Sequence, residues 1–279
     1  LINNNIKKHG KEKIGCLISG QSTSEELFMF QKIFRGLGVS NIDHRTKESN
    51  FDYQKNYPLM PSLGCNLKDL DEYENIILIG VNIKTEYPVL SIRLNLATKN
   101  KTKVHSFNFN SLDENFDLHC KEIIDHSNIE SFLNVNNVEL GQGKTLIIIG
   151  PLVSRSPNQS NILKSISKFS SSIDATMGFL TESCNSTSGW LLGNVPHREL
   201  GGNQSKIIGK NSYEMITDKL SSYVLYNLEP EHDFFDKSLV ESALESSECN
   251  IFFTSYITPM IEKYAHIIIP ITTFAEADG

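Results

Sequence analysis

Residues 250–270 read NIFFTSYITPMIEKYAHIIIP, and this stretch decides the fold class. Two short apolar runs, 250–254 and 265–269, have the length and the branched side chains of buried strands. Between them, Thr258-Pro259 opens a short helical segment, since proline is well tolerated in the first turn of a helix. The second run ends at Pro270, which has no N–H to give to a sheet ladder. Strand, helix and strand in this order predict a parallel β-α-β unit.

The same alternation runs back to the N-terminus. Apolar runs predict further strands at residues 13–19, 41–45, 75–80, 102–107, 145–150, 175–180 and 222–228. Helical spacing of apolar residues predicts helices at residues 22–37, 87–97, 162–170 and 235–244. Residues 46–66 and 110–143 are polar and aperiodic and are expected to be excursions, the second with one short helix at 118–126.

The strand pattern restarts at Thr145 after the second excursion. We therefore expect an α/β protein of two doubly wound, mainly parallel-sheet units, residues 1–143 and 144–279. The final segment stops soon after a strand, at Asp278-Gly279, without a closing element. This ending predicts that the second unit is truncated and that the chain is a piece of a longer protein.

Composition excludes several classes of function. Hydrophobic residues make up 39% of the chain and charged residues 21%, which is typical of a globular protein. The net charge of −7 argues against a nucleic-acid surface, which needs clustered lysine and arginine. No apolar run approaches the roughly 18 residues that cross a bilayer, so direct membrane insertion is not expected.

Metal ligands are not clustered in the sequence. The five cysteines are far apart and contain no Cys-x-x-Cys pair, whereas zinc and iron–sulfur sites draw on local clusters. Cys16 lies in an apolar run and is expected to be a buried thiol. No two histidines stand four residues apart on an expected helix. We therefore expect five reduced cysteines and no metal site; they are Cys16, Cys65, Cys120, Cys184 and Cys249.

Two loops carry residues that could suggest a ligand site. The segment Gly141-Gln-Gly143-Lys144-Thr145 suggests a phosphate loop, but it precedes a strand, whereas a phosphate loop follows a strand and opens a helix. The acidic loop at residues 229–233 (EPEHD) follows a strand. It is compatible with a bound cation, and also with acids placed near the N-terminus of a helix, which that end of the helix dipole favours.

Taken together, these segments resemble the molybdopterin oxidoreductase family. The matching pieces are residues 41–45 (NIDHR), 79–82 (IGVN), 86–90 (EYPVL), 178–182 (GFLTE), 229–233 (EPEHD) and 251–279, whose Tyr264-Ala265…Pro270…Glu276…Gly279 resembles a family signature. Their order and spacing most resemble the branch formed by the large iron–sulfur subunit of bacterial NADH-quinone oxidoreductase (complex I). The resemblance implies a fold of the formate dehydrogenase and DMSO reductase type.

One departure from the family shapes the functional expectation. Active pterin enzymes usually carry Asn-Pro after the second strand glycine, whereas Asn82 is followed by Ile83. The resemblance therefore implies a degenerate domain without catalytic residues and without its own cofactor. Vestigial pterin positions are expected at the carboxyl ends of strands around a cleft, namely Gly80, Asn82, Glu229, Tyr256 and Thr258.

The parent assembly implied by this branch oxidises NADH and passes electrons through 4Fe-4S and 2Fe-2S clusters to quinone. The clusters would lie in an N-terminal part of the same subunit that precedes this chain. The implied partners are that part and other peripheral-arm subunits, on the cytoplasmic side of the bacterial inner membrane. The alternative is a fragment of an active molybdopterin-dependent oxidoreductase such as a formate dehydrogenase.

Overall fold

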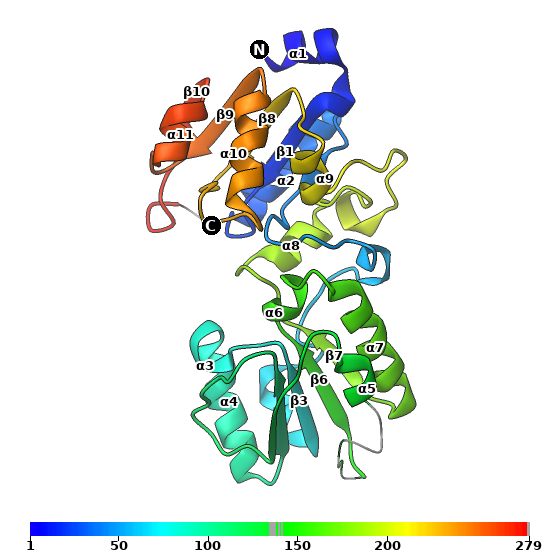
Figure 1. The fold of residues 1–279 in the computed structure, drawn as a ribbon. Coiled ribbons are helices and arrows are strands. Elements are labelled where there is room, and N and C mark those ends of the chain that lie inside the picture. The colour runs from blue at the N-terminus through cyan, green and yellow to red at the C-terminus, as the bar shows by residue number, and fades with distance from the viewer. Residues whose placement is uncertain (134–137, 139, 141, 278–279) are drawn as a thin grey trace. The chain divides into compact units, whose positions relative to one another are not determined.

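The computed structural model describes residues 1–133, 138, 140 and 142–277, and the chain forms two compact units (Figure 1). The first unit contains Leu1–Ser49 and Ser183–Gly279, and the second contains Asn50–Glu182. The expected division at residues 143 and 144 is therefore wrong. It would cut one sheet in two, because β3 (Asn75–Ile79) pairs in parallel with β6 (Thr145–Ile149). The restart at Thr145 is a return to the same sheet after an excursion.

The first unit is built on a five-stranded sheet in the order β10-β9-β8-β1-β2, with every pair parallel. Helix α2 covers one face of this sheet, and α9, α10 and α11 cover the other. Its strands are β1 (Ile14–Ile18), β2 (Ile42–Asp43), β8 (Ser222–Tyr226), β9 (Cys249–Thr254) and β10 (Ile267–Pro270). Its helices are α1 (Ile2–His9), α2 (Ser24–Gly36), α8 (Ser186–Leu191), α9 (Ser212–Thr217), α10 (Lys237–Ser246) and α11 (Pro259–Tyr264), with 3-10 turns η1 (Lys11–Lys13) and η4 (Leu200–Gly202).

The second unit has the same plan, with a parallel sheet in the order β5-β4-β3-β6-β7. Helices α5 and α7 pack on one face and α4 on the other. The remaining strands are β4 (Lys103–Asn108), β5 (Cys120–Ile123) and β7 (Thr176–Phe179). The helices are α3 (Ile83–Glu86), α4 (Pro88–Lys99), α5 (Ile129–Phe132), α6 (Pro151–Ser154) and α7 (Gln159–Ser172), with 3-10 turns η2 (Gln54–Asn56) and η3 (Leu67–Glu72).

The central strands explain why both sheets are parallel. All five residues of β3 and all five of β6 are buried, as expected for strands covered by helices on both faces. Alternate side chains serve opposite faces: Ile77 and Ile147 pack towards α7, whereas Ile76 and Leu146 pack towards α4. The expected fold class, two parallel-sheet α/β units, is confirmed.

Local sequence signals located the start of α2 correctly and gave the wrong type for one other element. Thr23 caps α2 in a capping box with Glu26, at the expected helix start. The expected helix at residues 118–126 is wrong, because Cys120–Ile123 form strand β5 beside β4. The polar sequence of β5 reflects its place at the exposed edge of the sheet.

Three residues named in the sequence analysis, Gly141, Asp278 and Gly279, lie outside the described part of the chain. Among the described residues, no helix has the length and apolar character needed to cross a bilayer.

Candidate functional site

The strand orders place a switch point in each sheet. The order reverses between β8 and β1 in the first unit and between β3 and β6 in the second. In open parallel sheets, ligands bind in the crevice beyond the carboxyl ends of the strands at such a point. The loops that follow these four strands are therefore the candidate functional sites of the two units.

The switch point of the second unit is filled by its own valines. Gly80 follows β3 with a φ of 62°, in the left-handed region that favours glycine. A Cβ atom at Gly80 would lie 2.6 Å from Cγ2 of Val153 in α6. A Cβ atom at Gly150, which follows β6, would collide with the side chain of Val81. Each strand-end glycine thus makes room for a valine of the neighbouring loop.

Hydrogen bonds hold the same two loops together. The N–H of Leu152 donates to the carbonyl oxygen of Gly80 at 3.0 Å. The N–H of Val81 donates to Oδ1 of Asn108 at 2.7 Å, at the end of β4. Asn82 is the N-cap residue of α3 but makes no side-chain capping bond. The backbone of Gly80 and Val81 therefore forms its hydrogen bonds within the second unit.

In the first unit, the switch point is covered by residues 183–186. A Cβ atom at Gly20, after β1, would lie 2.5 Å from Oγ of Ser186. The N–H of Asn185 donates to the carbonyl oxygen of Gly20 at 3.0 Å, and Nδ2 of Asn185 donates to the carbonyl oxygen of Ser22 at 2.8 Å. Protein atoms therefore occupy the space beside the strand-end glycine here as well.

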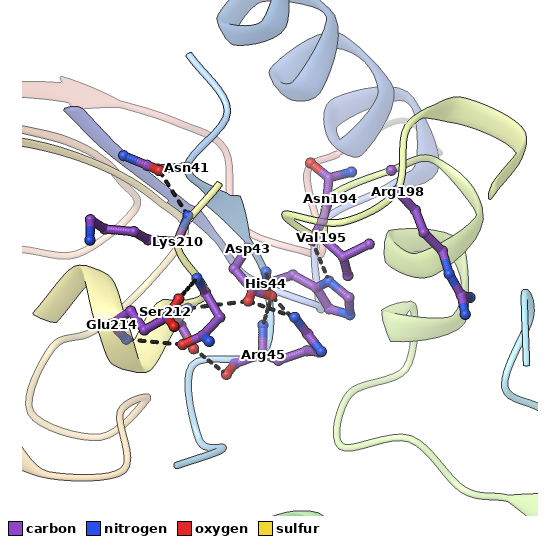
Figure 2. Close-up of polar contacts among 12 residues, drawn as sticks. Asn41, Asp43, His44, Arg45, Asn194, Val195, Arg198, Lys210, Ser212 and Glu214 are labelled. Atoms are coloured by element: carbon purple, nitrogen blue, oxygen red, sulfur yellow. Dashed lines mark hydrogen bonds and ion pairs between the residues drawn. The ribbon is translucent and has the colours of Figure 1, made fainter. Parts of the chain in front are cut away.

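A buried ion pair lies at the carboxyl end of β2 (Figure 2). Nε of Arg45 donates to Oδ1 of Asp43, and Nη2 donates to Oδ2, both at 2.8 Å. The N–H of His44 donates to Oδ1 at 2.8 Å, and the N–H of Ser212, from α9, donates to Oδ2 at 3.2 Å. Oγ of Ser212 donates to the carbonyl oxygen of Arg45 at 2.7 Å. Asp43 thus joins β2 to α9.

The charge of Asp43 is maintained by this arrangement. Burial alone raises the pKa of the Asp43 carboxyl, but the charge and hydrogen bonds of Arg45 outweigh it, and the pKa lies below its ordinary value. Asp43 has no exposed surface. The pair is therefore ionised at neutral pH, where it serves as an internal cross-link.

His44 points to the other side and contacts the segment after α8. Its Nδ1–H donates to the carbonyl oxygen of Asn194 at 2.8 Å (Figure 2). Burial lowers the pKa of His44 to about 4, so the ring is neutral at neutral pH.

The guanidinium carbons of Arg45 and Arg198 lie 4.8 and 5.3 Å from the ring centre of Trp190, close enough for cation–π contacts.

Capping and backbone bonds complete this network around β2. The N–H of Lys210 donates to Oδ1 of Asn41 at 2.9 Å, and Asn211 forms a capping box with Glu214 at the start of α9. Nη2 of Arg35, from α2, donates to three carbonyl oxygens within residues 193–198. The network cross-links β2, α2, α8 and α9.

The acidic loop at residues 229–233 caps a helix. Oγ1 of Thr258, the N-cap residue of α11, donates to Glu231 at 2.8 Å, and the N–H of Met260 donates to Glu231 at 2.7 Å. The N–H of Glu229 donates to Oδ2 of Asp233 at 2.8 Å. Burial raises the pKa of Glu231, but the bonds from Met260 and Thr258 outweigh it and lower the pKa below its ordinary value. The sequence left open whether this loop binds a cation or places acids at the N-terminus of a helix. For Glu231, the structure shows the second.

A groove of about 550 Å³ opens beside this loop, lined by Glu231, His232, Lys237, Glu241, Thr258 and Lys263 with three apolar residues. Within residues 1–133, 138, 140 and 142–277, no three His, Cys, Asp or Glu side chains are grouped so as to hold a metal ion. All five cysteines are free thiols, and Cys16 is buried as expected.

The five vestigial positions belong to two different units. Gly80 and Asn82 follow β3 in the second unit, whereas Glu229 follows β8 and Tyr256 and Thr258 follow β9 in the first. Glu229 and Thr258 lie in loops that the Glu231–Thr258 bond joins, and the Tyr256 side chain is 62% exposed. That all five surround one cleft stays a prediction.

The Asp43–Arg45–Ser212 network was not predicted from the sequence. The NIDHR segment was expected to be a strand and to match the family, but neither signal pointed to Ser212, which is remote in sequence. The available signal was the Asn-x-x-Glu capping box at residues 211–214, which marks the start of α9.

Comparison with known proteins decides the family, because the molybdopterin oxidoreductase family profile matches residues 1–279. The chain belongs to the molybdopterin oxidoreductase family. Among curated relatives, a Staphylococcus aureus protein provisionally named a formate dehydrogenase is 28% identical over 108 residues, which is 36% of this chain and 11% of that protein. The same match is found in a second strain of S. aureus.

Two solved structures share the fold. The formyltransferase/hydrolase complex of Methylorubrum extorquens, in complex with methylofuran, superposes with a TM-score of 0.57 at 10% identity, over 97% of this chain and 83% of that chain. Acetylene hydratase from Pelobacter acetylenicus superposes with a TM-score of 0.52 at 10% identity, over 94% and 49%. At this identity the likeness concerns the fold alone.

The family is named for a pterin cofactor, so the strand-end glycines can be tested against it. A ligand in such a crevice needs a glycine turn that its ring or phosphate can approach closely. The side chains that closely approach Gly80, Gly150 and Gly20 are those of Val153, Val81 and Ser186. Within each unit, the space beside these strand-end glycines is occupied by the chain's own side chains.

Proposed function

We propose that this chain is a structural, cofactor-free domain of the large iron–sulfur subunit of a bacterial complex I, in the peripheral arm. The observation that carries the proposal is the filling of both switch points by the chain's own side chains. In the second unit Val81 and Val153 occupy the space beside Gly150 and Gly80, and in the first unit Ser186 occupies the space beside Gly20. Such packing favours a rigid scaffold over a ligand crevice.

The network around Asp43 supports the same role. A buried, hydrogen-bonded ion pair cross-links β2 and α9, and Arg45 also stacks on Trp190. The resemblance to complex I spans nearly the whole chain and supports this parent assembly over other family members. The proposed partners are the cluster-bearing N-terminal part of the same subunit and neighbouring subunits, at the cytoplasmic face of the inner membrane.

The runner-up is a fragment of an active molybdopterin-dependent oxidoreductase such as a formate dehydrogenase. The match to the staphylococcal relatives favours it. That match covers 11% of the relatives' length, so it concerns a small part of a longer protein.

The choice of electron donor tests the proposal. The parent protein is tagged and purified from its own cells with its associated subunits, and reduction of an artificial acceptor is measured with NADH and with formate. We expect NADH to support reduction and formate to give none. Formate-dependent reduction that copurifies with the tagged protein would establish the runner-up instead.

A further inference from the structure

Helix α4 of the second unit is apolar on two sides. Its inner side, which includes Leu90 and Leu94, is buried against the sheet. Its outer side carries Val89, Ile92 and Leu96, which are 62%, 59% and 47% exposed. Positions i, i+3 and i+7 form one stripe along a helix. A helix that packs against a sheet normally keeps its solvent side polar, so an apolar stripe there marks an interaction surface.

A groove extends the stripe beyond the helix. It has a volume of about 470 Å³ and is lined mainly by apolar residues of the second unit. Val89 both lines the groove and begins the stripe, and Leu67, which also lines the groove, is 40% exposed. Groove and stripe therefore form one surface, here called the α4 face and defined by Leu67, Val89, Ile92 and Leu96.

The charged residues of α4 are all basic. The helix carries Arg93 and Lys99 and no acidic residue, although the chain as a whole has a net charge of −7. Both side chains are exposed, and neither forms an ion pair with another described residue. Arg93 and Lys99 border the stripe at helical spacing. The 3-10 turn η3, which packs beside α4, carries the acids Asp69, Asp71 and Glu72.

We propose that the α4 face docks an amphipathic helix of a partner protein whose apolar ridge is flanked by carboxylates. An apolar stripe that continues into a groove is the surface on which a helix lays its apolar side. Carboxylates beside the ridge would meet Arg93 and Lys99, which lack acidic partners on this face. A second copy of this chain would bring two basic helices together, so charge disfavours it as the occupant.

The proposal is independent of the assembly proposed above and is tested with two synthetic peptides. Both are labelled helical peptides with the same leucine ridge, one flanked by glutamate and the other by lysine. Binding to the 279-residue chain is measured by fluorescence anisotropy at low salt, where exposed charges are least screened. We expect the glutamate peptide to bind at least about tenfold more tightly, the size of one buried charge contact.

Three variants sharpen the test. Ile92→Asp should lower the affinity for the glutamate peptide at least about tenfold, since it places a carboxylate in the apolar stripe. Arg93→Glu with Lys99→Glu should reverse the preference between the peptides. Ile33→Asp, at a similarly exposed apolar position on α2 (51%), is the matched control and should leave binding unchanged.

Equal binding of both peptides, no binding of either, or an Ile92→Asp variant that binds as wild type would overturn the proposal. Light scattering of the chain alone supplies a further check. A dimer that Ile92→Asp dissociates would assign the α4 face to a second copy and would also overturn it.

Discussion

Replacement of Asp43 by asparagine should destabilise the first unit strongly. The change keeps the volume of the side chain but removes the charge that faces Arg45 in a site with no exposed surface. Three backbone N–H groups, from His44, Arg45 and Ser212, also donate to this carboxylate. Removing one partner of a buried, hydrogen-bonded ion pair costs about 3–5 kcal/mol.

The chain contains its own probe for this measurement. Trp190 is the single tryptophan, lies in the first unit, and stacks on Arg45. Its fluorescence therefore reports unfolding of this unit in urea. With a urea dependence of about 2 kcal/mol per molar, the unfolding midpoint of Asp43→Asn should fall by about 1.5–2.5 M.

The pH dependence gives the same prediction a second test. The pKa of Asp43 is lower in the folded state, because Arg45 outweighs the effect of burial. A carboxyl with a lowered folded pKa contributes stability above its ordinary value of about 3.9, and this is lost as the pH falls through the folded pKa. The stability gap between wild type and Asp43→Asn should thus be constant from pH 7 to 5 and shrink below pH 4.

An exposed ion pair of the same unit provides the control. Glu248 pairs with Lys8 at 2.6 Å and both side chains are exposed, so Glu248→Gln should leave stability almost unchanged. If Asp43→Asn unfolds at the same urea concentration as this control, the Asp43 network does not hold the first unit together.

Three further substitutions have defined outcomes. Burial lowers the pKa of His44 to about 4 from about 6.5, so wild-type stability should fall as the pH drops from 6.5 to 4, and His44→Gln should remove much of that slope in tryptophan-detected urea titrations. Gly80→Ala should cost about 2–4 kcal/mol through its positive φ and its contact with Val153; calorimetry should show partial recovery on adding Val153→Ala, and no recovery would refute the packing. Thr258→Val should cost about 1 kcal/mol by removing the N-cap of α11, and a double-mutant cycle with Glu231→Gln that shows no coupling would contradict their hydrogen bond.

Much of the fold could be predicted because its signals are local. The run at residues 75–79 (NIILI) is apolar nearly throughout and short, as a strand buried on both faces must be. Strand β5 gave no such signal, because an edge strand exposes its side chains and its polar sequence resembles a surface helix. The inserted unit was missed since strand pairing between β3 and β6 joins residues 70 positions apart, which periodicity cannot reveal.

The candidate sites were only partly predictable, for a related reason. The strand-end glycines Gly80 and Gly150 are visible in the sequence, but the valines that fill their space are identified only by the fold. Likewise Asp43 and Arg45 are neighbours in sequence, whereas Ser212 reaches them from α9, 169 positions away from Asp43. Tertiary contacts of this kind decide whether a family signature marks a ligand site or an internal cross-link.

The molybdenum and pterin content of the parent protein tests the cofactor-free proposal most directly. The protein is purified from cells that make the molybdenum cofactor, alongside a formate dehydrogenase from the same cells as the positive control. Molybdenum is measured by mass spectrometry and pterin by its fluorescence after oxidation. We predict that the control carries both and the parent protein neither, whereas stoichiometric molybdenum and pterin in the parent protein would contradict the proposal.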